Sequence, residues 1–179
     1  MTRASQSNAV VLYSQRLSFV AELAVFCRQQ LRAENPRPVR DVLGIALRQL
    51  ADHAVSSRGK GKYLGHAPWS RSALRILEGN NGRVRGVERQ LSHEHVVPVS
   101  YVLDVLLGED MPIGQSEEVI AKLSVVAVIT RTEDQRVSKS GLRTKMPTYW
   151  DRADLWARFK DSRVGLYEEM DFGVEHEKT

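Results

Sequence analysis

Apolar residues at helical spacing predict a long helix at the start of the chain. They recur every three or four positions over residues 9–31, and Asn35-Pro36 ends the pattern because a residue before proline avoids the α region. A second apolar pattern begins at about Pro38, whose ring suits a first helical turn, and reaches Leu50. The two segments predict an antiparallel helical hairpin, with Cys27 as a core thiol on its apolar side.

Beyond the hairpin, short helical patterns surround one buried strand. Helical spacing recurs over 70–77 and 99–107, and a further helix is expected to start at Ser116, a favourable N-cap followed by acids. Residues 124–130 are rich in β-branched side chains, which predicts a buried strand. Thr130 or Thr132 then caps a short helix, and residues 151–160 form a final amphipathic helix. The predicted class is mainly α (α+β).

Charge is distributed unevenly along the chain. Eight Lys and Arg face two Glu between Ser56 and Arg89, whereas five acids face one Lys from Val164 onward. The chain therefore divides into a helical hairpin at 1–55, a basic linker and helix region at 56–90, a central unit at 91–163 and an acidic tail at 164–179. The basic region can bind a polyanion, and the acidic tail cannot.

Composition narrows the class of protein further. The chain has 179 residues, with 26 Lys and Arg against 22 Asp and Glu, which gives a formal net charge of +4. This length is typical of one domain. No apolar stretch approaches the ~20 residues of a membrane span, and the start of the chain lacks a secretion pattern. The lone cysteine allows neither an internal disulfide nor a zinc site built from several cysteines. We therefore expect a cytoplasmic protein without membrane contacts.

The densest chemistry is the run His93-Glu94-His95. In an extended segment, residues two apart project to one side, so His93 and His95 converge while Glu94 points away, unless the chain bends there. Neutral imidazole and carboxylate both suit divalent metals, and a histidine near neutral pKa can take a proton from water. A lone His-x-His is also common as a surface or hydrogen-bonded pair, so a structural role stays open.

The wider segment resembles a known family. Glu94-His95-Val96-Val97-Pro98 resembles the first motif of HNH (ββα-metal) nucleases, and residues 126–134 resemble the second strand and helix start of such a unit. The likeness spans about residues 91–147 and implies a small ββα-like unit with a helical insertion at 99–123. It implies that His95 is the catalytic general base and that Glu94 binds one divalent metal, magnesium or manganese, beside the scissile phosphate.

The chain departs from the HNH pattern after the second strand. HNH proteins usually present an asparagine in the loop and a histidine or asparagine on the closing helix, but no His or Asn occurs between His95 and His176. Glu133 and Asp134 stand where the last ligand is expected, although acids in a first helical turn also complement the helix dipole. The candidate metal ligands are Glu94, His93, Glu133 and Asp134.

Basic residues lie on both sides of this segment and are candidate phosphate contacts. They are Arg83, Arg85, Arg136, Lys139, Arg143 and Lys145.

Three hypotheses follow. The first is a divergent HNH-type nuclease that hydrolyses phosphodiester bonds in DNA or RNA, which the resemblance associates with a phage or defence setting. The second is a non-catalytic factor of mainly helical fold that binds nucleic acid or protein, with the N-terminal helices as the surface for a homodimer or a protein partner. The third, a zinc hydrolase using His93 and His95, lacks a third ligand at short spacing.

Overall fold

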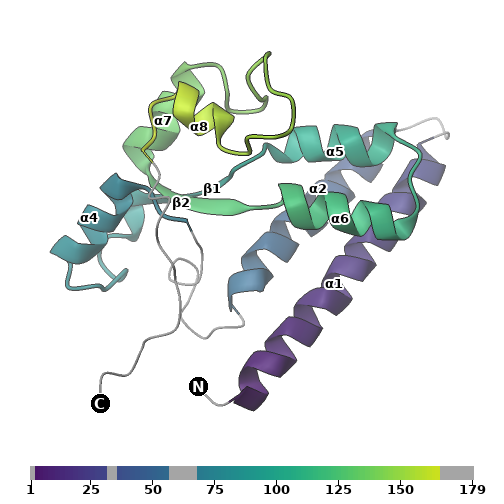
Figure 1. Cartoon of the computed structure of the whole chain (residues 1–179), viewed down its shortest axis with the longest axis horizontal. Coiled ribbons are helices and arrows are strands. Elements are labelled where there is room, and N and C mark those ends of the chain that lie inside the picture. The colour runs from purple at the N-terminus through teal and green to yellow at the C-terminus, as the bar shows by residue number, and fades with distance from the viewer. Residues whose placement is uncertain (1–2, 32–35, 57–67, 166–179) are drawn as a thin grey trace.

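The computed structural model describes residues 3–31, 36–56 and 68–165 (Figure 1). Nearly all of the acidic tail, and the basic stretch that includes Arg58, Lys60 and Lys62, lie outside the described residues. Helices dominate the described chain, and one antiparallel pair of strands accompanies them. The predicted mainly α (α+β) class is therefore confirmed. Among the described helices, none is both long and apolar enough to cross a bilayer.

The larger core lies between four helices. The predicted hairpin consists of α1 (Arg3–Gln30) and α2 (Pro36–Ser56), which run antiparallel and side by side (Figure 1). The predicted insertion consists of α5 (Val99–Gly108) and α6 (Ile113–Leu123), which pack against this hairpin. Cys27 is buried in the shared core as expected, and burial raises the pKa of its thiol. The hairpin at 1–55 thus shares one core with the insertion of the central unit.

The two strands carry a helix layer on each face. β1 (Leu91–His95), which follows a short 3-10 turn at Glu88–Gln90, pairs antiparallel with β2 (Val126–Thr130). One face packs on α4 (Arg71–Gly79) through Trp69 and Val128. The other face packs on α7 (Arg131–Lys139) and α8 (Ala157–Asp161) through Ile129, Val137 and Phe159. Figure 1 shows α4 on one side of the strands and α7 with α8 on the other.

The start of α7 follows from its local sequence. Thr130 is the N-cap, and its Oγ1 accepts a hydrogen bond from the Glu133 backbone N–H at 3.1 Å. The Glu133 carboxylate in turn accepts from the Thr130 backbone N–H at 2.8 Å, which completes a capping box. The predicted helix at this point, with Thr130 as its cap, is confirmed.

Among the helices that follow the hairpin, two predicted boundaries are wrong. The helix expected to start at Ser116 begins earlier, at Ile113 after Pro112, and Ser116 is buried inside it instead of capping it. The final helix occupies only Ala157–Asp161, where the sequence predicts 151–160. Side chains explain the second difference, because Asp151 and Asp154 each accept a hydrogen bond from the backbone N–H two residues ahead. Such turns compete with a helix, and Arg152 has a φ of +72°, which no right-handed helix accepts.

Candidate functional site

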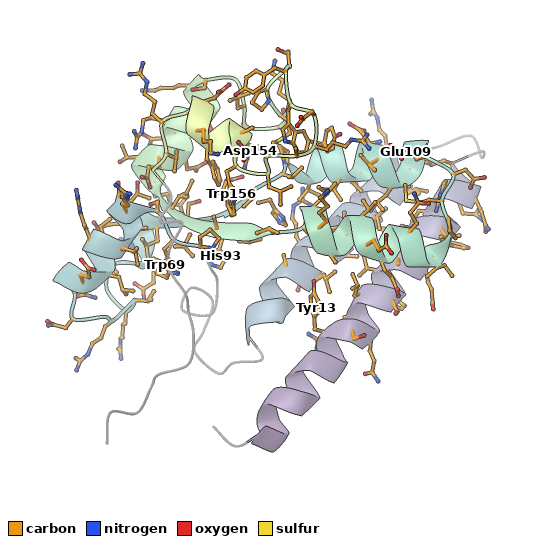
Figure 2. All side chains as sticks on the ribbon, in the orientation of Figure 1. Tyr13, Trp69, His93, Glu109, Asp154 and Trp156 are labelled. Carbon is orange, nitrogen blue, oxygen red and sulfur yellow. The ribbon has the colours of Figure 1, made fainter. Side chains whose placement is uncertain are left out.

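β1 separates the histidines from the acid between them. His93 lies opposite Val128, His95 opposite Val126 and Glu94 opposite Ala127. Directly opposed residues project to the same face of a sheet. Since Val128 packs beneath α4 and Ala127 beneath α7 and α8, His93 and His95 belong to the α4 face, whereas Glu94 belongs to the α7 face. Figure 2 shows His93 near Trp69, on the side of the strands away from Trp156. The expectation that the two histidines share a face without Glu94 is confirmed.

Glu94 forms an ion pair with a fully buried arginine. Arg158 Nη2 lies 2.9 Å from Glu94 Oε1 and also donates to the His95 carbonyl, while Nε donates to the Val96 carbonyl at 2.9 Å. Nη1 donates to the carbonyls of Leu142 at 2.9 Å and Arg143 at 3.3 Å. A guanidinium has five N–H donors, so each donor of Arg158 has an acceptor. This side chain therefore ties the end of β1 to the chain that follows α7.

Sequence reasoning assigned no role to Arg158. Its acceptors lie between 15 and 64 residues away along the chain, so local spacing does not reveal them. The only local signal is a cation within the apolar run Leu155-Trp156-Ala157-Arg158-Phe159.

The electrostatics of this region involve four charged groups. Burial raises the pKa of the Glu94 carboxyl, and the charge and hydrogen bond of Arg158 oppose that rise. Asp134 raises the pKa of Glu94 further, whereas Arg143 lowers it. Burial also lowers the pKa of Arg158, and Glu94 opposes this. The ion pair of Glu94 with Arg158 thus lies within the electrostatic influence of one further carboxylate, Asp134, and one further guanidinium, Arg143.

Glu133 serves as a structural anchor for two helices. Its side chain is only 1% exposed, and Oε2 accepts from Ser70 Oγ at 2.5 Å as well as from the Thr130 backbone. Ser70 Oγ also accepts from the Ala73 backbone N–H and is the N-cap of α4. One carboxylate therefore joins the N-termini of α4 and α7 across the sheet edge. Oε2 takes all of these hydrogen bonds and Oε1 lies 3.7 Å from Arg136 Nη2, so we assign Glu133 the structural role.

The four candidate metal ligands are not brought to one point. His93 lies on the face opposite Glu94, Glu133 is bonded to Ser70 and Thr130, and Asp134 interacts electrostatically with Glu94. In the part of the chain that the structure describes, no three His, Cys, Asp or Glu side chains are grouped as a metal site requires. Two carboxylates suit magnesium only when phosphate oxygens and waters complete its coordination shell.

The candidate phosphate contacts fall on two surfaces. Arg83 and Arg85 are exposed beyond the end of α4, where Asn80 donates to both of their carbonyls. The remaining four are exposed on the other side of the sheet, on α7 and on the chain that follows it: Arg136, Lys139, Arg143 and Lys145.

The chain after α7, residues 141–147, is held firmly in place, and we call it the anchored loop. Gly141 has a φ of +71°, which lets the chain turn out of α7. Arg158 binds the carbonyls of Leu142 and Arg143, and Ser100 Oγ donates to the Thr144 carbonyl at 2.6 Å. The carbonyls of the anchored loop are thus held by the protein, while the side chains of Arg143 and Lys145 face solvent.

Comparison of the chain with protein-family models, with curated proteins and with solved structures finds no match. Its function has to be argued from the site itself.

Proposed function

We propose that the protein binds nucleic acid through its phosphates, using α7 and the anchored loop. The observation that supports this most is the buried Arg158, whose N–H donors hold two carbonyls of the loop while the neighbouring cations point outward. A preorganised loop loses little conformational entropy when a ligand binds. No chemical step and no metal are required for this function.

The charges around the loop favour a polyanion. Residues 131–145 contain five cations against two acids, and one of these acids, Glu133, is buried. Arg143 can contact a phosphate through two parallel hydrogen bonds, and Lys145 adds a point charge. Contacts of this kind position a protein on the nucleic-acid backbone without reading its sequence.

A binding experiment in chelator tests this function. Fluorescence anisotropy with labelled duplex DNA and RNA at increasing salt is expected to give a linear fall of log affinity with log salt. Replacing Arg143 and Lys145 by Ala should weaken binding and flatten that slope by about 2, since each phosphate contact contributes about 0.9. Lys122→Ala, an exposed cation on α6, is the matched control and should change neither. Absence of salt-sensitive binding would contradict the proposal.

A divergent HNH-type nuclease is the second candidate. It is favoured by the resemblance of Glu94-His95 to the family motif and by the electrostatic interaction of Glu94 with Asp134, whereas the projection of Glu94 and His95 to opposite faces of β1 argues against it. In this candidate Glu94 and Asp134 would bind magnesium or manganese together with substrate phosphates, and His95 would take the proton from water. Glu94 would then have to exchange Arg158 for the metal, and the end of β1 would have to bend to bring His95 to the same side.

The nuclease is tested by cleavage of plasmid and RNA with magnesium, with manganese and with chelator. Metal-dependent cleavage that is lost in His95→Ala, while circular dichroism and binding are unchanged, would support it. Binding without cleavage under every condition would contradict the nuclease and would support the binding function.

We also propose that the protein is located in the cytoplasm. A single cysteine, Cys27, that is buried and free suits a reducing compartment such as the cytoplasm.

A further inference from the structure

Four large apolar side chains are exposed on the part of the helical hairpin whose side chains the structure describes, residues 13–31 and 37–51. Phe19 is 64% and Phe26 56% exposed on α1, and Val42 is 53% and Ile45 58% exposed on α2. Buried residues of the same helices, such as Ala24 and Leu47, face the core shared with α5 and α6. Exposed apolar residues scattered singly are ordinary, whereas four on neighbouring helices form a surface.

These four side chains lie on one outer face, which we call the hairpin face. Phe19 and Phe26 are seven residues apart, and Val42 and Ile45 are three apart, so each pair shares one side of its helix. Cys27 Sγ contacts the Val39 carbonyl, which fixes how the two antiparallel helices are aligned along their axes. In this alignment Val42 and Ile45 lie beside the stretch of α1 between Phe19 and Phe26.

The opposite sides of both helices are already covered. Ser18 of α1 donates to Glu117 of α6, and Arg40 of α2 pairs with Asp104 of α5 at 2.7 Å. The hairpin face therefore points away from α5 and α6.

We infer that the hairpin face is the interface of a symmetric dimer formed by a second copy of this chain. A two-fold axis that lies in the hairpin face, parallel to the two helices, places a second copy on this face and sets the α1 row of one copy against the α2 row of the other. The same patch then serves both copies, as a two-fold interface requires. The result is a four-helix arrangement with apolar residues at its centre. This inference does not depend on the nucleic-acid function.

The area of the face matches a stable dimer. An aromatic side chain offers roughly 150–250 Å², so Phe19 and Phe26 together with the two aliphatic residues expose about 400–500 Å² per copy. Interfaces are only about 60% apolar, so the polar rim raises the buried area to roughly 700–800 Å² per copy. A standard stable interface buries about 800 Å² on each partner.

Sedimentation velocity of the full chain tests the inference from about 1 µM to about 100 µM. We expect a dimer that dissociates on dilution. Phe26→Asp and Ile45→Asp should each raise the dissociation constant at least about tenfold, because each places a charge in the centre of the interface. Both positions are more than half exposed, so far-UV circular dichroism should be unchanged.

Ile113→Asp provides the matched control, because Ile113 is 42% exposed on α6 and lies outside the hairpin face. It should leave the dimer intact. A wild-type chain that stays monomeric at every concentration would overturn the inference. A different protein would then be the candidate partner of the hairpin face. A dimer that is insensitive to both hairpin substitutions would overturn it as well.

Discussion

Arg158 Nη2 lies 2.9 Å from Glu94 Oε1, and the arginine side chain of this pair is fully buried. The pair joins β1 to α8, two elements that are 64 residues apart at these positions. Because the same guanidinium also binds the backbone of the anchored loop, the position of the loop depends on the pair. The acid that resembles a nuclease metal ligand is therefore part of the support for the proposed phosphate-binding surface.

Replacing Arg158 by Ala should destabilise the protein strongly. The substitution leaves the half-buried Glu94 and several backbone carbonyls without donors, and removal of one partner from a buried pair costs about 3–5 kcal/mol. Arg158→Lys should retain only part of the stability that Arg158→Ala loses, since an ammonium has three donors and no planar geometry. Urea denaturation measures both effects.

The exposed pair Arg152–Glu109, at 3.1 Å, is the control for Arg158. Its loss in Arg152→Ala should cost about 0–1 kcal/mol. Equal losses for the two arginines would show that burial of Arg158 has no energetic importance.

The Glu94 carboxyl should make stability depend on pH. Its pKa is raised in the folded protein, so between the ordinary value near 4.5 and the raised value the folded state holds more protons than the unfolded state. The free energy of unfolding therefore falls as pH increases through this window, and it is highest, for this group, below the ordinary value. Glu94→Gln keeps the shape of the side chain and should remove this dependence. Denaturation of both proteins over a series of weakly acidic pH values measures the difference, and parallel curves would contradict it.

Periodicity predicts much of this fold but little of its site. The apolar pattern predicts α1 and α5, β-branched residues predict β2, and the capping box of Thr130 and Glu133 lies within four consecutive residues. Strand alternation also predicts that Glu94 points away from both histidines. These are local properties, so the sequence contains all that is needed to find them.

The rest depends on contacts between distant segments. Ser70 is 63 residues from Glu133, and no local pattern indicates that this carboxylate is buried between two helix starts. The short α8 has a different cause, because the side chains of Asp151 and Asp154 form turns that apolar periodicity does not reveal. The resemblance to HNH nucleases therefore predicts a metal ligand at Glu133, whereas in the structure Glu133 caps α7.

The contact between Ser70 and Glu133 should contribute to stability. Ser70→Ala removes the N-cap of α4 and one donor to the buried carboxylate, and loss of an N-cap costs about 0.5–2 kcal/mol. Glu133→Ala should cost more, since it also removes the capping box of α7 and leaves the Thr130 N–H without its acceptor.

Thermal unfolding measures these effects, and Thr132→Ala is the control, because Thr132 is exposed in the first turn of α7. The contact between Ser70 and Glu133 is expected to act on stability alone. The nucleic-acid affinity of Ser70→Ala, measured where the variant is folded, should therefore equal that of the wild type. A variant that remains fully stable would refute the anchoring role of Glu133.

The anchored loop offers a way to separate preorganisation from charge. Ser100→Ala removes the hydrogen bond to the Thr144 carbonyl without changing any cation. The loop then has more freedom before binding, and ordering one or two residues costs about 1–2 kcal/mol each at most, so affinity for nucleic acid should fall several-fold. The salt slope should stay the same, because the number of phosphate contacts is unchanged. Replacing Arg143 by Ala has the opposite signature, a reduced slope. Anisotropy titrations of the two variants in the same salt series distinguish the effects, and a Ser100→Ala protein with a reduced slope would contradict the prediction, because it would mean that a cation of the loop has lost its phosphate contact.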